Sequence, residues 1–233
     1  MTSTATIFGS TGLVGSFILS TVASLDAFKA IQTISRRAPK TQSPKLTATI
    51  EPDTTKWASS LSSSKPTPDV VFSALGTTRQ AAGGIANQWK IDHDLNVELA
   101  KTAHAAGVKT FVFVSSAGTD TILGSYLPYS KMKNGVEESI KSLAFDQAII
   151  LRPGIIIGDR EVPHLGGPLL MSLIHGIGKV SRGWQDSWGQ DADVIGRAAV
   201  HAATLAAEGK APSKYWILGS DDIVKLGRDE WKA

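Results

Sequence analysis

Short apolar runs alternate along this chain with longer segments of helical character. Apolar positions spaced by three or four residues, or Ala-rich composition, predict helices at 13–23, 56–61, 91–106, 129–143 and 192–207. Runs rich in β-branched and aromatic residues predict strands at 4–8, 31–35, 46–50, 70–72, 111–114, 148–151 and 215–218. Strands that alternate with helices are typical of a doubly wound, mainly parallel sheet with helices on both faces. We therefore predict an α/β fold.

Proline and glycine interrupt this alternation at two places. Pro39 and Pro44 break any helix between the second and third predicted strands. Residues 162–189 are rich in glycine and irregular, which is typical of a segment that covers a substrate. At 233 residues the chain is long enough for one complete α/β domain. We predict a single domain, 1–233, in which 155–190 form a small irregular C-terminal substrate lobe.

A glycine-rich turn joins the first predicted strand to the first predicted helix. Gly9, Gly12 and Gly15 stand three residues apart, whereas the dinucleotide fingerprint is G-x-G-x-x-G. Glycine there lets backbone N–H groups approach a pyrophosphate, and the helix N-terminus favours the anion. This predicts a Rossmann-type NAD(P)-binding domain, and a glycine turn that binds nothing is the alternative. The predicted phosphate contacts are Gly9, Ser10, Thr11, Gly12, Leu13, Val14 and Gly15.

Two arginines follow the second predicted strand. An NAD-binding domain usually carries Asp or Glu about 20 residues after the loop for the ribose hydroxyl; here Arg36 and Arg37 stand after Ser35. Guanidinium groups pair with phosphate in bidentate fashion. The cofactor is therefore expected to be NADPH (NADP), unless the arginines are only solvated surface residues.

Tyr129 and Lys133 lie four residues apart, on one face of a predicted helix. The strand before that helix ends in Ser115 and Ser116, so the polar groups could converge at the strand ends. Tyr129 would exchange a proton with a substrate oxygen, Lys133 would lower the phenol pKa and hold the nicotinamide ribose, and Ser116, rather than Ser115, would orient a carbonyl. The alternative places Tyr129 on an ordinary amphipathic helix with Lys133 in solvent.

Composition and absent motifs exclude other chemistries. The net charge is only +3 and the basic residues form no run, which argues against a nucleic-acid partner. With no cysteine, the chain has no disulfide or thiolate site, and its five histidines have no metal-ligand spacing, so we expect no metal. Neither a G-x-S-x-G elbow nor a P-loop is present. The uncharged first 25 residues are expected to be structural, and no apolar run approaches the roughly 18 residues that span a bilayer.

Together these motifs resemble the atypical branch of the short-chain dehydrogenase/reductases, in the family of the human Tat-interacting oxidoreductase and its fungal relatives named for being found in the mitochondrial proteome. The resemblance covers nearly the whole chain and is densest between 70 and 160. Besides the glycine loop it rests on Arg36, Arg37, Leu75, Gly76, Thr77, Thr78, Arg79, Ser115, Ser116, Tyr129, Lys133, Phe145, Asp146, Arg152, Pro153, Gly154, Asp159 and Arg160.

The resemblance implies further contacts and a location. It places Leu75, Gly76, Thr77, Tyr129, Lys133 and Ile156 at the cofactor and makes Tyr129 the proton donor or acceptor. It also implies peripheral association with the mitochondrial outer membrane, with the cytoplasm as the alternative. The segment 162–189 departs most from the human relative.

The leading hypothesis is an NADPH-dependent oxidoreductase that reduces a carbonyl or oxidises an alcohol by hydride transfer, with a small-molecule carbonyl or alcohol as substrate. The family also includes regulators, so a non-catalytic NADPH-sensing regulatory or binding protein is the alternative. A third reading is a structural α/β protein with an empty loop. Monomers and dimers share these motifs, which therefore specify no oligomeric state.

Overall fold

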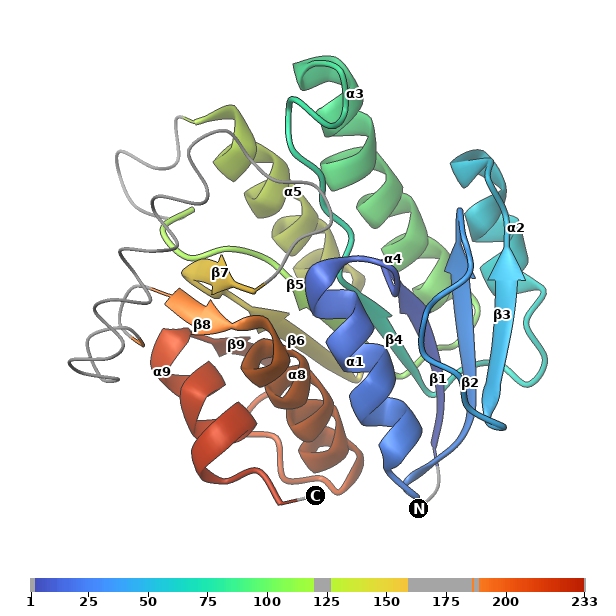
Figure 1. Ribbon diagram of the computed structural model, residues 1–233, viewed down its shortest axis with the longest axis vertical. Coiled ribbons are helices and arrows are strands. Elements are labelled where there is room, and N and C mark those ends of the chain that lie inside the picture. Colours follow the sequence, from blue (N-terminus) through green and yellow to red (C-terminus); the bar gives the residue numbers. More distant parts are fainter. Residues whose placement is uncertain (1–2, 120–126, 159–185, 187–188, 233) are drawn as a thin grey trace.

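A seven-stranded parallel sheet organises the computed structural model, which describes residues 3–119, 127–158, 186 and 189–232 (Figure 1). Its strand order is β3-β2-β1-β4-β5-β6-β9, so the order reverses beside β1, where β4 pairs with it. Every adjacent pair is parallel. The strands are β1 (Ser3–Phe8), β2 (Phe28–Ser35), β3 (Leu46–Ile50), β4 (Val70–Ser73), β5 (Thr110–Val114), β6 (Gln147–Leu151) and β9 (Tyr215–Leu218).

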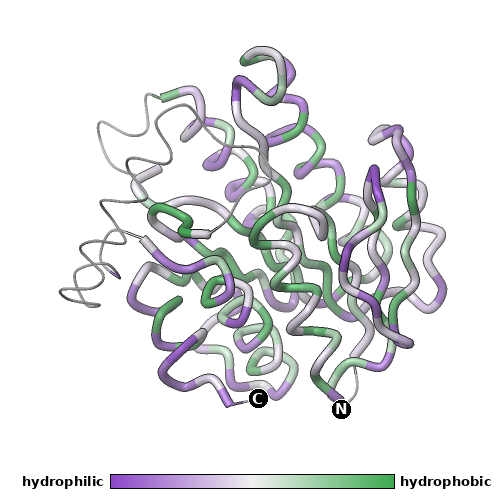
Figure 2. The backbone as a smooth tube through the Cα atoms, in the orientation of Figure 1, coloured by the Kyte–Doolittle hydropathy of each residue, from purple (hydrophilic) through white to green (hydrophobic). Residues whose placement is uncertain are grey.

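Helices cover both faces of the sheet, as the alternation predicts. One face carries α1 (Leu13–Ser24) and α8 (Ala192–Ala207), and the other carries α2 (Trp57–Ser62), α4 (Asn96–Ala105) and α5 (Pro128–Leu143). Side chains of the strands contribute to a hydrophobic core on each face of the sheet. On β5, Val112 packs in the core with α1 and α8, whereas Phe111 packs in the core with α2, α4 and α5. Figure 2 shows hydrophobic positions gathered in the central strands, between these two layers. The α/β, doubly wound fold is therefore confirmed.

Several boundaries differ from those expected. β2 begins three residues before the predicted strand, at Phe28, and β2 joins β3 without a helix, as the two prolines indicated. The helix predicted at 91–106 is instead three segments: α3 (Ile85–Trp89), the π-helical turn η2 (Lys90–Leu95) and α4. Smaller segments went unpredicted: the 3-10 turn η1 (Thr54–Lys56), α9 (Ser220–Val224) and the π-helical turn η4 (Lys225–Asp229).

A second, two-stranded parallel sheet corrects part of the C-terminal prediction. Within 155–190 the sequence indicated only irregular structure, but β7 (Ile155–Ile157) pairs with β8 (Gly189–Asp191). Glycine at 189 made this strand hard to recognise from the sequence. The glycine is needed because a Cβ there would lie 2.6 Å from the Ile155 carbonyl oxygen. Residues 159–185, 187 and 188 of the predicted lobe, which include Trp184 and Trp188, lie outside the described residues.

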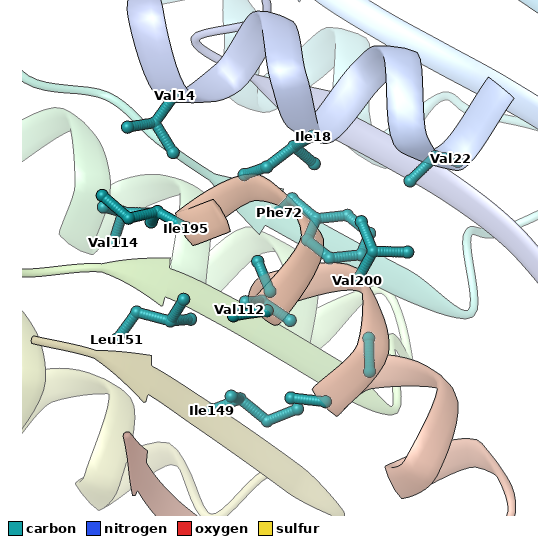
Figure 3. Close-up of a cluster of buried hydrophobic side chains, with 14 of the residues drawn as sticks. Val14, Ile18, Val22, Phe72, Val112, Val114, Ile149, Leu151, Ile195 and Val200 are labelled. Atoms are coloured by element: carbon teal, nitrogen blue, oxygen red, sulfur yellow. The ribbon is translucent and has the colours of Figure 1, made fainter. Parts of the chain in front are cut away.

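Close contact between α1 and α8 fixes the larger core. Val14, Ile18 and Val22 of α1 face Ile195 and Val200 of α8 above the sheet (Figure 3). Gly196 allows the approach, because a Cβ there would lie 2.8 Å from the Phe17 Cβ and 3.0 Å from the Ile18 backbone nitrogen. Since α1 also begins at the glycine turn, this packing helps to place that turn.

We expect Gly196→Ala to destabilise the fold by about 1–3 kcal/mol, because the added methyl group overpacks two helices whose backbones cannot both stay in place. Urea denaturation followed by circular dichroism measures the change. Ser20→Ala, on the exposed side of α1, is the matched control and should change stability by less than about 0.5 kcal/mol. An unchanged midpoint for Gly196→Ala would show that the helices have room to separate.

Candidate functional site

The predicted site residues gather at one edge of the sheet. Because all seven strands are parallel, their carboxyl ends lie at the same edge, where doubly wound sheets bind ligands. Gly9 follows β1, Arg36 follows β2, Leu75 follows β4 and Ser116 follows β5. The reversal of strand order between β1 and β4 lies among them, which is the usual position of the binding crevice.

The glycine turn is packed too tightly for any side chain at two of its positions. Gly9 has φ +79°, and a Cβ on it would lie 2.6 Å from the carbonyl oxygen of Ala74, just beyond β4. A Cβ on Gly15 would overlap the carbonyl oxygen of Gly9. The Gly12 N–H donates to that same oxygen at 2.8 Å. The start of α1 therefore lies directly against the ends of β1 and β4.

This turn has the features of an anion site. Gly12 is the N-cap of α1 and provides no side-chain cap, and the first turn of the helix contains no acidic residue. Ser10 is 1% exposed, and its hydroxyl has no hydrogen-bond partner among the described residues. A buried hydroxyl without a partner is costly, and an anion bound at the helix start could satisfy it. Thr11 and Leu13 are partly buried beside it, and Val14 lies in the core.

Arg36 and Arg37 are exposed directly after β2. The Ser35 hydroxyl donates to the Arg37 carbonyl oxygen at 2.8 Å and so shapes the turn that carries both side chains. Both arginines therefore lie at the carboxyl edge of the sheet.

Lys133 is the most unusual residue of the site, because its side chain is almost completely buried. The residue is 3% exposed, its Nζ donates to the Val114 carbonyl oxygen at 3.0 Å, and the ammonium lies 4.6 Å from the centre of the Phe113 ring. Burial lowers the pKa of Lys133 from 10.5 to about 8, against the opposing effect of the Asp92 and Glu137 carboxylates. The alternative that leaves Lys133 in solvent is wrong.

Tyr129 lies in the first turn of α5, one turn before Lys133, and is 40% exposed. Ser116 is half-buried at the end of β5, where its hydroxyl lies 3.5 Å from the Ala117 carbonyl oxygen. Ser115, by contrast, is 3% exposed and donates its hydroxyl to Glu137. The structure thus places Tyr129, Lys133 and Ser116 on adjoining elements and gives Ser115 a separate role.

An ion pair that the sequence did not suggest lies behind these residues. Glu137 on α5 is 4% exposed and pairs with Arg152 just after β6, with Nη2 to Oε2 at 2.7 Å. The hydroxyl of Tyr215 donates to the Glu137 carbonyl oxygen at 3.4 Å, and burial, followed by the Glu137 carboxylate, raises the pKa of Tyr215 to about 12. Glu137 is four residues after Lys133, a spacing that could have indicated it.

A second buried carboxylate, Asp92, was also missed. It lies on η2, is 0% exposed and accepts the Thr77 backbone N–H at 2.7 Å. The Gln88 amide donates to its other oxygen at 3.3 Å, and burial raises the pKa of Asp92. No local pattern indicated this residue, because its shortest hydrogen bond comes from Thr77, 15 residues earlier in the chain.

The remaining predicted contacts lie in the segment after β4 and on β7. Leu75 is 9% exposed, Gly76 is exposed and Thr77 is half-buried in the segment that follows β4. Ile156 is the central residue of β7, where it pairs with Gln190. Within the described part of the chain, no group of three or more His, Cys, Asp or Glu side chains could hold a metal ion. The described helices also include none that is long and apolar enough to span a membrane.

Comparison with known proteins identifies close relatives. A family model described as HIM1 matches residues 46–170. The chain is 63% identical to "Protein FMP52, mitochondrial" of Chaetomium globosum, over 97% of each chain. It is 60% identical to "Protein fmp-52, mitochondrial" of Neurospora crassa, over 99% of this chain and 97% of that one.

Solved structures share the fold at low sequence identity. A short-chain dehydrogenase/reductase of Saccharomyces cerevisiae matches with a TM-score of 0.71 and 15% identity, over 96% of this chain and 99% of that chain. MoeE5, solved in complex with UDP-glucuronic acid and NAD, matches with a TM-score of 0.69 and 15% identity, over 97% of this chain and 81% of its own. The fold is therefore that of the short-chain dehydrogenase/reductases.

We expect Arg152→Met to destabilise the protein by about 3 kcal/mol, since it leaves the buried Glu137 carboxylate without its cation. Arg228→Met is the matched control, because the pair of Arg228 with Asp186 is more exposed and should contribute less than about 1 kcal/mol. Denaturant unfolding of both variants measures the difference. Equal losses would mean that the Glu137 carboxylate is solvated or protonated rather than paired.

Proposed function

The chain belongs to the fungal FMP52 family of atypical short-chain dehydrogenase/reductases, and from that premise we propose that it is an NADPH-dependent oxidoreductase. The observation that carries the proposal is the buried ammonium of Lys133, one helical turn after Tyr129 and at the sheet edge that carries the glycine turn. A buried charge of this kind costs stability, so its position beside a candidate proton donor supports a catalytic role. The reaction would be carbonyl reduction or alcohol oxidation.

The described residues fit a dinucleotide. The uncapped start of α1 and the unpartnered hydroxyl of Ser10 would hold the pyrophosphate, and glycine at 9 and 15 keeps the backbone close enough. Arg36 and Arg37 would hold a 2′-phosphate, which favours NADPH over NADH. Leu75, Gly76, Thr77 and Ile156 would contact the rest of the cofactor. MoeE5, whose structure contains NAD, supports a nicotinamide dinucleotide in this fold.

Bound NADPH would supply the hydride, and the chain would supply the proton and the orientation. Tyr129 would donate its phenol proton to the carbonyl oxygen in reduction and accept one in oxidation. The Lys133 ammonium would stabilise the phenolate by charge and donate to the nicotinamide ribose. Ser116, which is not engaged by Glu137 as Ser115 is, would donate a hydrogen bond to the substrate oxygen.

The proposal extends to substrate and location. The substrate would be a small carbonyl or alcohol compound, and the chain would form a single domain. Relatives are named mitochondrial, which supports a mitochondrial location, and we propose peripheral attachment to the outer membrane. Carbonate extraction of isolated mitochondria tests the attachment, because a peripheral protein is released and an integral one is retained.

Replacing both Arg36 and Arg37 with Ala should weaken NADPH binding by about tenfold or more, since charge-assisted hydrogen bonds to the 2′-phosphate are lost. NADH affinity should stay the same, because NADH has no such phosphate. Fluorescence titration with both cofactors measures the effect, and Lys29→Ala, at the amino end of the same strand, is the control. Equal affinity of the unmodified protein for NADPH and NADH would contradict the 2′-phosphate assignment.

Tyr129→Phe should reduce turnover of carbonyl substrates by at least about 100-fold, because the proton donor is removed, while NADPH affinity stays within about twofold. A panel of aldehydes and ketones, followed by NADPH absorbance, measures turnover, and Tyr215→Phe, which removes a phenol hydroxyl from β9, is the control. Undiminished turnover in Tyr129→Phe would exclude that residue from the mechanism. Tight NADPH binding with no turnover of the panel by the unmodified protein would instead favour the NADPH-sensing alternative.

A further inference from the structure

We propose that Asp92 is a positioning residue that keeps Lys133 in its charged form, and that it thereby sets the pH at which the site loses its ammonium. This proposal rests on the proposed function, because that function gives Lys133 its role in turnover. The charge of Lys133 can nevertheless be measured without turnover, so the two proposals can fail separately.

The side chains of Asp92 and Lys133 both approach the same residue, Gly76. A Cβ built on Gly76 would be 4.0 Å from Asp92 Oδ1 and 4.0 Å from Lys133 Nζ. Asp92 reaches this point from η2 and Lys133 from α5, and the two residues are 41 positions apart in the sequence. The carboxylate and the ammonium therefore border the same space after β4, where each charge acts on the other.

The Asp92 carboxylate is held in place by groups that carry no charge. The Thr77 backbone N–H donates to Oδ1 at 2.7 Å, and the Gln88 amide donates to Oδ2 at 3.3 Å. One turn further on, Asn96 donates to the Asp92 carbonyl oxygen at 3.2 Å and accepts the Ser73 hydroxyl at 2.6 Å. These contacts fix η2 against the end of β4. The carboxylate is thus oriented, and its negative charge is not cancelled by them.

The other groups around Lys133 do not supply the negative charge that Asp92 provides. Glu137, one turn along α5, already pairs with Arg152 at 2.7 Å. His93 of η2 packs over Gly135 of α5, where a Cβ would lie 2.6 Å from the His93 Nε2, and its Nδ1 lies 2.8 Å from the exposed carboxylate of Asp94. From β5, Lys133 contacts the uncharged Phe113 ring and the Val114 carbonyl oxygen, and on its own helix Tyr129 lies one turn away.

The direction of the effect follows from burial. Burial lowers the pKa of Lys133 to about 8, and the Asp92 carboxylate is the first of two charges that oppose this fall. Lys133 is charged below its pKa and neutral above it. Removing the Asp92 charge leaves the burial penalty uncompensated, so the pKa of Lys133 must fall further. The site then loses its ammonium at a lower pH.

Asp92→Asn tests this with little change in shape. In protein labelled with 13C at lysine Cε, without cofactor or substrate, the Lys133 resonance is assigned by its loss in Lys133→Arg and titrated with pH. Asp92→Asn should lower the pKa of Lys133 by about one pH unit or more. Asp94→Asn, which removes an exposed carboxylate from the same turn, should leave that pKa unchanged. An unchanged Lys133 pKa in folded Asp92→Asn would overturn the proposal.

The pH dependence of kcat separates positioning from a structural role. If turnover is observed, the alkaline limb of the kcat profile should move to lower pH in Asp92→Asn by the same amount as the Lys133 pKa, whereas a structural defect would lower kcat equally at every pH.

A second variant is used if Asp92→Asn does not fold. Asp92→Ser removes the charge with a smaller side chain, and the same titration of Lys133 applies. Absence of turnover in every variant counts against the proposed function and leaves the titration to decide on Asp92.

Discussion

The site depends on one costly feature, the buried ammonium of Lys133. An isolated charge cannot remain in such surroundings without compensation, and the fold supplies it from three elements: the Val114 carbonyl oxygen of β5, Asp92 of η2 and Glu137 of α5. Glu137 is in turn neutralised by Arg152, beyond β6. Lys133, Asp92 and Glu137 are therefore buried charged residues, and Arg152 beside them is partly buried. Their contacts tie α5 to the sheet and to the helical segment beside it.

The segment that leaves β4 connects this charged cluster to the glycine turn. Ala74 lies against Gly9 so closely that no side chain fits between them. Two residues later Gly76 lies beside both Asp92 and Lys133, and the Thr77 N–H donates to the Asp92 carboxylate. Residues 74–77 therefore contact both the glycine turn and the surroundings of Lys133. In the proposed function this segment would bring the anion site and the proton donor into one crevice at the reversal of strand order.

Local sequence pattern predicted most of the fold, because strand and helix periodicity record which side of each element is buried. The runs at 46–50, 192–207 and 215–218 became β3, α8 and β9 without change. The pattern failed where backbone geometry is set by distant contacts. The π-helical turn η2 brings the Asp92 carboxylate to the Thr77 backbone N–H, and β8 contains a glycine that the close approach of β7 requires.

The candidate site divides in the same way. Gly9, Gly12, Gly15, Tyr129 and Lys133 could be found from spacing, because their roles depend on one turn or one helix face. The sequence pattern could not predict that Asp92 lies near Lys133 or that Arg152 pairs with Glu137, because each pair joins elements that are far apart along the chain. Burial of Lys133, which separates a functional lysine from a solvated one, is likewise a property of the assembled fold.

A crystal structure of the protein grown with NADP⁺ tests the central claim most directly. The account predicts the pyrophosphate against the first turn of α1 beside Ser10, the 2′-phosphate between Arg36 and Arg37, and the nicotinamide on the side of Lys133 and Tyr129. A cofactor bound away from the glycine turn, or a nicotinamide remote from Lys133 and Tyr129, would contradict it.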